Sequence, residues 1–337
     1  MDAELSLDDA RVRLRAGLVS LIVASVLLAA KYQAYRMTGS AAVLSDALES
    51  IVNVVAAVFA LGGLVFAGRP ADRNHPYGHG KIEFFSAAFE GGLIAFASVL
   101  VVYGALRSLI QGPEVRQIGL GILIVLGSAL VNLGLGGYLV RTGRRHRSLT
   151  LVADGQHVLA DVWTSGGIVV GLGLVRFTGL AWLDPVVALL VALWLMWTGF
   201  TLVRHAAGGL LDEEDPALLN NVLAALQRHL GNGVIRVHHL RAIRSGRYQH
   251  VEAHLVVPEF WSVERAHDLS EEVAAHTMQD LGVEGEMVFH TDPCHRIYCA
   301  VCDLADCPIR REPYRGTIPM TLEEAVQPDL PRVAPGA

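Results

Sequence analysis

Long apolar segments limit what this chain can fold into more than any other feature of its sequence. Six runs are each long enough to cross a bilayer, which takes about 20 helical residues, and they lie at 16–35, 40–67, 84–110, 118–140, 152–175 and 184–203. Composition agrees, because 52% of the 337 residues are hydrophobic and only 18% are charged, as is typical of membrane proteins. The sequence therefore predicts an α-helical membrane protein with six transmembrane helices over residues 16–204.

Basic residues predict how these helices are oriented. The N-terminal arm (residues 1–15) and the connections 68–83 and 141–151 together hold ten Lys and Arg, whereas the opposite connections hold mainly Arg36, Arg107, Arg116 and Arg176. Short loops rich in Lys and Arg stay on the cytoplasmic side of a membrane. We therefore expect a multi-pass protein of the cell (inner) membrane with both termini in the cytoplasm.

The chain changes character after Arg204. From His205 onward there are eleven Lys and Arg against twenty Asp and Glu, and this part holds ten of the fourteen His and all four Cys. An acidic surface repels nucleic acid and attracts cations. We therefore expect cationic ligands and no nucleic acid as a partner.

Local patterns predict a small cytoplasmic α+β domain over residues 205–292. A helix at 216–230, two strand-like runs at 234–243 and 248–257 separated by Ser245-Gly246-Arg247, a helix at 263–281 and a short strand at 286–290 give the ferredoxin-like order α-β-β-α-β. In the second run, period-two alternation places His250, Glu252 and His254 on one face. That face is either solvated surface or a metal-binding surface.

Polar residues inside the apolar runs carry the strongest functional signal. His157 and Asp161 are four residues apart in the fifth run, and Glu49 and Asn53 are four apart in the second, so each pair shares one helix face. An imidazole and a carboxylate can each give one bond to a zinc-like ion; the alternative is that these residues hydrogen-bond across a helix bundle. Glu90, in the third run, has the same two interpretations.

Two further groups of residues have the chemistry of metal ligands. In the loop after the second run, an Asp precedes a His-Pro-Tyr-Gly-His turn, which brings together Asp72, His75 and His79. In the C-terminal tail (residues 293–337), the cysteines follow a C-x4-C-x2-C-x4-C pattern at Cys294, Cys299, Cys302 and Cys307. In the cytosol this pattern indicates a metal or redox site rather than disulfides, unless the thiols are unrelated. Beyond Pro308 we expect extended or disordered chain.

Several strings in the right order resemble one known family, the cation diffusion facilitators, which are dimeric divalent-metal/proton antiporters. They are TGSAAVLSDALESIVN, ADRNHPYGHGKIE, ADGQHVLADVWTSGG, GGLLDEE, HHLRAIRSG, VEAHLVV and FHTDPC. The resemblance implies a transport site of Glu49, Asn53, His157 and Asp161, a loop site of Asp72, His75 and His79, and cytoplasmic-domain sites from His238, His254, His267, His290 and Asp292. It also implies an ion pair between Lys81 and Asp212 that holds the dimer.

The resemblance further implies a secondary active transporter rather than an enzyme. Such a homodimer in the lipid bilayer would export zinc, or else Fe, Co, Ni, Cd or Mn, in exchange for protons by alternating access. No nucleotide is expected, because the chain lacks G-x-x-x-x-G-K-[ST]. The alternatives are a metal sensor without transport, a membrane metalloenzyme and a passive channel. Two departures stand out: Asn53 replaces a carboxylate of the relatives that the chain resembles, and the cysteine cluster is an addition.

Overall fold

A computed structural model describes residues 2–38, 41–111, 120–180, 182–316 and 318–328, and the side chains of some helical residues, Glu49 among them, lie outside the description. The chain divides into two compact units, Met1–Leu211 and Asp212–Ala337. Each unit is described by itself below.

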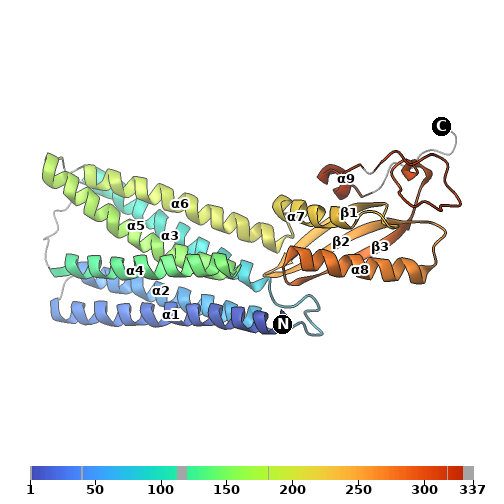
Figure 1. The fold of residues 1–337 in the computed structure, drawn as a ribbon. Coiled ribbons are helices and arrows are strands. Elements are labelled where there is room, and N and C mark those ends of the chain that lie inside the picture. The colour runs from blue at the N-terminus through green and yellow to red at the C-terminus, as the bar shows by residue number, and fades with distance from the viewer. Residues whose placement is uncertain (1, 39–40, 112–119, 181, 317, 329–337) are drawn as a thin grey trace. The chain divides into compact units, whose positions relative to one another are not determined.

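The first unit is a bundle of long helices (Figure 1). Its helices are α1 (Asp2–Thr38), α2 (Ala41–Ala67), α3 (Ile82–Gln111), α4 (Leu120–Arg145), α5 (Leu149–Thr178) and α6 (Leu183–Leu210). Among the described residues, five of them, all but α4, are long and apolar enough to cross a membrane. Residues 118 and 119, where the fourth predicted run begins, lie outside the description. The prediction of a helical transmembrane domain is confirmed.

Close backbone packing joins α3 to α6 in this bundle. A Cβ atom built on Gly199 would lie 2.7 Å from the carbonyl oxygen of Gly91, and one built on Gly91 would lie 3.0 Å from that of Gly199. Only glycine allows two helix backbones to approach this closely. The contact fixes the position of α3, and with it the neighbouring Glu90.

A buried ionic cluster fastens α1 and the start of α5 to α3. Arg13 Nη1 donates to Glu83 Oε1 at 3.0 Å, and Ser148 Oγ donates to Glu83 Oε2 at 2.6 Å. Arg13 and Glu83 are 6% and 2% exposed, so removing either partner leaves a buried charge at a cost of about 3–5 kcal/mol. Residues 2–15 of the predicted arm are thus part of α1, and Arg13 is a packing residue as well as a basic one.

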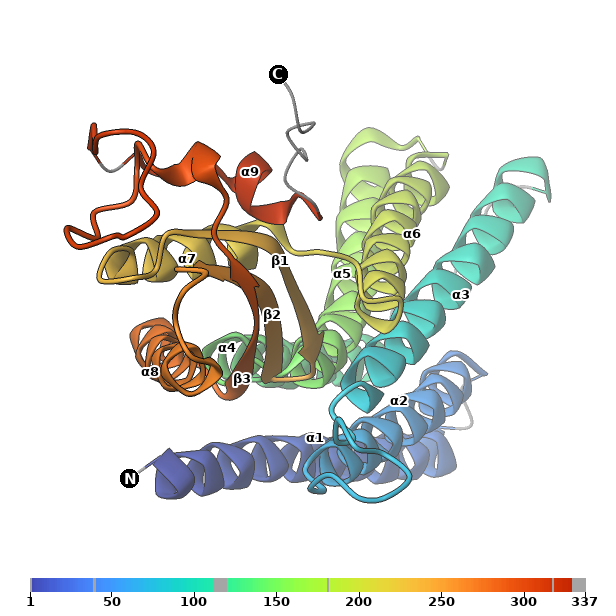
Figure 2. The same ribbon diagram turned by 90° about the vertical axis from the view of Figure 1, so that its right-hand side faces the viewer.

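The second unit is a sheet of three strands, and helices lie against it (Figure 2). Its elements are α7 (Pro216–Leu226), a 3-10 turn (Gln227–His229), β1 (Arg236–Ser245), β2 (Tyr248–Val257), α8 (Val263–Leu281), β3 (Gly285–Pro293), a second 3-10 turn (Arg296–Tyr298) and α9 (Leu322–Val326). The strand order is β1-β2-β3, with β1 antiparallel and β3 parallel to β2. The predicted order α-β-β-α-β is confirmed.

The core of this unit explains why these elements form. Asp215 caps α7 by accepting from the backbone N–H groups of Ala217 and Leu218, and Ser262 caps α8. Val222 of α7 and Val273 of α8 are buried in one cluster with residues of the sheet. Both helices therefore cover the same face of the sheet, as Figure 2 shows.

The segment after the cysteines also belongs to this unit, which corrects the expectation of extended or disordered chain beyond Pro308. Met320 and Ala325 are 5% and 0% exposed and join the core. Gln227 Nε2 donates to the carbonyl oxygen of Met320 at 2.6 Å, and Thr321 caps α9 with a capping box. The buried side chains of Met320 and Ala325, together with the capping box, anchor this short helix. Residues 329–337 lie outside the description.

Candidate metal centres

Three of the four predicted transport-site residues can be placed, and they contact one another across α2 and α5. His157 Nε2 lies 3.2 Å from Asn53 Oδ1, and Asn53 Nδ2 donates to Asp161 Oδ2. His157 is 5% exposed. Glu49 lies on α2, one helical turn before Asn53, but its side chain is outside the description. The arrangement offers nitrogen and oxygen ligands on facing helices, a set suited to a zinc-like ion.

Two further carboxylates lie beside this set. Glu90 Oε2 is 3.8 Å from His157 Nδ1, and Asp154 lies within electrostatic reach of Glu90. Glu90 and Asp154 are 0% and 1% exposed, and within the described part of the chain neither oxygen of Glu90 has a hydrogen-bond partner. Sequence reasoning missed Asp154, although its spacing of three and seven residues from His157 and Asp161 was a usable signal.

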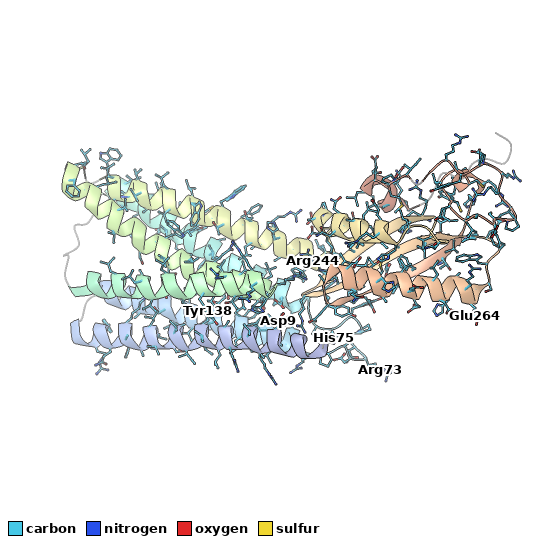
Figure 3. The ribbon with its side chains drawn as sticks, in the orientation of Figure 1. Asp9, Arg73, His75, Tyr138, Arg244 and Glu264 are labelled. Carbon is cyan, nitrogen blue, oxygen red and sulfur yellow. The ribbon has the colours of Figure 1, made fainter. Side chains whose placement is uncertain are left out.

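The loop between α2 and α3 brings Asp72, His75 and His79 together. One ligand atom from each lies within 4.8 Å of the others; His75 Nδ1 is 3.1 Å from Asp72 Oδ1, and His79 Nε2 is 3.4 Å from Asp72 Oδ2. His75, labelled in Figure 3, lies in this loop. The backbone N–H groups of His75 and Asn74 both donate to Asp72 at 2.8 Å. These bonds, His75 first, hold the pKa of Asp72 below its ordinary value despite some desolvation, which keeps the carboxylate ionised for a cation.

The sheet of the second unit assembles a second three-residue group. His238 of β1, His254 of β2 and Asp292 of β3 place ligand atoms within 4.8 Å of one another, and each imidazole lies 2.9 Å from Asp292 Oδ2. His290 Nε2 lies 3.4 Å from Asp292 Oδ1 at the rim. Burial raises the pKa of Asp292, but the hydrogen bonds and charges of His254 and His238 outweigh it, so that pKa lies below its ordinary value.

His239 lies beside this group, and sequence reasoning did not single it out. Its ring centroid is 4.7 Å from that of His254. Strict alternation would turn neighbouring residues to opposite faces of the strand, but the register shifts between His238 and Arg241 and His239 has a φ of 53°. No pattern in the sequence predicts this bulge.

Other predicted residues are not joined by the structure. His267 is exposed on α8 and is outside both three-residue groups found among the described residues. The ion pair of Lys81 with Asp212 would link the two units and stays a prediction.

The four cysteines line one pocket of the second unit, and all are free thiols. Burial raises the pKa of Cys294 and of Cys302 above the ordinary thiol value. Neither therefore has the lowered pKa that marks a catalytic or redox-active cysteine.

Comparison with known proteins identifies both units. Residues 17–211 match the model of the cation efflux transmembrane domain, and residues 215–294 match that of the cation efflux protein cytoplasmic domain. The chain is 38% identical to the uncharacterized transporter sll1263 of Synechocystis sp. over 256 residues, 76% of this chain and 82% of the relative. It is 27% identical to the cation-efflux pump FieF of Cronobacter sakazakii over 291 residues, 85% of this chain and 95% of the pump.

The family match is decisive because the first model alone spans more than half of the chain. Members of this family carry cations across membranes and do not catalyse a chemical reaction. This multi-pass membrane protein therefore belongs to the cation diffusion facilitator family and is a cation-efflux transporter, not an enzyme.

Proposed function

We propose that this transporter exports a divalent transition-metal cation, zinc first among them, from the cytoplasm in exchange for protons. The observation that carries the proposal is the contact of Asn53, His157 and Asp161 across two apolar helices. With Glu49 from the next turn of α2, they would form a four-ligand transport site. The imidazole of His157 favours zinc-like ions over magnesium or calcium.

Proton exchange follows from the chemistry of the ligands. Imidazole and carboxylate must be deprotonated to bind a metal ion, so metal and protons compete for the same atoms. If the site opens alternately to each side of the membrane, a proton gradient drives the metal outward without ATP. We place the protein in the cell (inner) membrane with both termini cytoplasmic, since the connections richest in Lys and Arg are those on the side of the termini.

Dimerisation and regulation belong to the same proposal. We infer a homodimer whose cytoplasmic domains bind metal through His238, His254, His267, His290 and Asp292, and whose protomers are held by Lys81 and Asp212. The shared carboxylate of Asp292, 2.9 Å from two imidazoles, supports the metal-binding role.

A metal panel in proteoliposomes tests the proposed function. Purified protein is reconstituted with a pH-sensitive dye inside, and Zn, Fe, Co, Ni, Cd, Mn and Mg salts are added in turn. We expect zinc-dependent proton movement that vanishes without protein. Metal flux without proton movement would rule out antiport, and tight binding without any flux would identify a sensor instead.

Glu90 is expected to orient His157 through its second ring nitrogen. When Nε2 binds the metal, Nδ1 carries the proton and faces the Glu90 carboxylate, an arrangement that strengthens histidine ligands. Glu90→Gln preserves the volume but removes the charge, so we expect metal affinity and transport to fall by about 10–100-fold. Isothermal titration and flux assays measure both. If Glu90 only fills space, Gln will behave as wild type and only Glu90→Ala will fail.

Replacing Asp292 by Asn is expected to weaken metal binding in the cytoplasmic domain while transport at saturating metal persists. The lowered pKa gives the sign of the pH effect: the ionised carboxylate contributes stability above about pH 3.9, its unfolded value, and loses it as pH falls through the lower folded value. The free energies of unfolding of wild type and variant should therefore differ at neutral pH and become equal in strong acid. Glu264→Gln, an exposed site at the start of α8 (Figure 3), is the matched control, and equal metal counts in Asp292→Asn and wild type would contradict the assignment.

A further inference from the structure

The cysteine segment folds into a pocket that neither transport nor the histidine site uses. All four thiols of residues 294–307 line it, together with apolar side chains that include Ile235 and Ile309. Cys302 packs in a small core with Ile235, Val256 and Tyr298. Unrelated thiols in a mobile tail would not share one pocket, so this arrangement needs an explanation.

One arginine fixes the backbone around the pocket. Arg310 Nη1 donates to the carbonyl oxygen of Cys299 at 2.9 Å, and Arg310 Nη2 donates to those of Cys302 and Leu304 at 3.0 and 2.5 Å. The backbone N–H of Cys294 also donates to the carbonyl oxygen of Val257, the last residue of β2, at 2.8 Å. The loop is thereby held in place before any ligand arrives, which lowers the entropic cost of binding.

Backbone groups of the chain bond three of the four sulfur atoms, as hydrogen-bond donors do in thiolate metal sites. The backbone N–H of Arg311 donates to Cys299 Sγ at 3.5 Å. The backbone of Glu259 bonds Cys294, and that of Leu304 bonds Cys302. Backbone N–H groups aimed at sulfur stabilise the negative charge of a bound thiolate.

Two arginines lie near the sulfurs, although Arg296 also donates to Glu259 Oε1 at 2.7 Å. Arg296 interacts electrostatically with Cys294 and Cys299, and Arg310 does so with Cys302. Four thiolates around a divalent ion carry a net charge of about −2. These guanidinium groups would offset part of that charge, whereas a purely apolar pocket would not.

We propose that Cys294, Cys299, Cys302 and Cys307 form a four-thiolate site for one soft divalent cation such as zinc. Among the described residues, no three of these sulfurs lie within 4.8 Å of one another. Metal binding therefore requires the sulfurs to move together, to Zn–S bonds of about 2.3 Å. The two residues between Cys299 and Cys302 suit a chelating turn.

The site would hold the C-terminal segment on the domain. Beyond the cysteines, the backbone N–H of Arg315 donates to the carbonyl oxygen of Ala300 at 2.7 Å, and Arg236 Nη1 donates to the carbonyl oxygen of Ile318 at 2.6 Å. At the end of α9, Gln327 accepts from the backbone N–H of His239 at 2.8 Å. A metal in the pocket therefore restrains a segment that ends against the histidine site.

The test counts metal in the full-length protein, purified in detergent without reduction and washed with a mild chelator. Wild type is compared with the Cys294→Ser/Cys299→Ser/Cys302→Ser/Cys307→Ser variant and with a His238→Ala/His254→Ala control, by elemental analysis and native mass spectrometry. We expect one more tightly held zinc per chain in wild type and in the histidine variant than in the serine variant. Asp161→Ala should also keep this zinc, which separates the inference from the transport proposal.

A second measurement on wild type alone keeps the inference testable if the serine variant misfolds. We expect the four thiols to resist alkylation until a strong chelator removes the metal, and cobalt loading to give the intense absorption of tetrahedral cobalt thiolate. Equal metal counts with four freely alkylated thiols would overturn the site. So would disulfides between these cysteines, or visible absorption with stoichiometric iron and sulfide, which would mean an iron–sulfur cluster.

Discussion

Asp161→Ala is expected to abolish metal transport while the protein still inserts, folds and dimerises. Asp161 contacts Asn53 across two helices and is the charged ligand of the proposed set on α5. Losing a ligand from a four-ligand site leaves the ion too few partners. Changes in the surrounding shell already cost about 10–100-fold, so flux should fall by more than about 100-fold, to the background of empty liposomes.

Two companion variants separate ligand loss from packing. Asp161→Asn keeps the size of the side chain but not its charge, and we expect it to fail as well. Thr198→Ala removes a hydroxyl from α6 that donates to the carbonyl oxygen of Trp194, in its own helix, at 3.0 Å, and this variant should transport normally. Near-normal flux by both Asp161 variants, with intact size-exclusion profiles, would contradict the transport-site assignment.

Asn53→Asp is expected to tighten divalent-metal binding by about tenfold or more and to slow release. Asn53 now accepts from His157 and donates to Asp161. A carboxylate cannot donate, so the variant places two like charges in contact inside an apolar bundle. That repulsion is relieved only by a cation or a proton. Affinity should therefore rise at neutral pH and fall more steeply than in wild type as pH is lowered.

Titration calorimetry at two pH values and flux under a fixed gradient measure these effects. Asn132→Asp is the matched control, because Asn132 lines the same cavity as Asn53 and receives the same amide-to-carboxylate change. We expect Asn132→Asp to raise metal affinity less than Asn53→Asp does. An equal rise would mean that any negative charge added to this cavity produces the effect. If Asn53→Asp leaves affinity unchanged in a folded protein, Asn53 is a packing residue.

Sequence patterns were sufficient wherever one residue's surroundings follow from its neighbours in the chain. Apolar runs of membrane length predicted helices because the backbone must satisfy its own hydrogen bonds in lipid. The helix 263–281 and the strand 248–257 have the predicted bounds, since caps, periodicity and the Ser-Gly-Arg turn are local signals. The close group of Asp72, His75 and His79 needed only a tight turn.

The tertiary structure alone decided several contacts between distant groups that neither the local patterns nor the family resemblance predicted. It set Glu90 against His157 from another helix, and the bulge in β1 turned His239 toward His254. It also folded α9 onto the core and gathered four cysteines around one pocket. These outcomes depend on helix packing distances, strand register and the burial of a few apolar side chains. Each is a sum of small free energies over residues far apart in the chain, and no local pattern in the sequence encodes that sum.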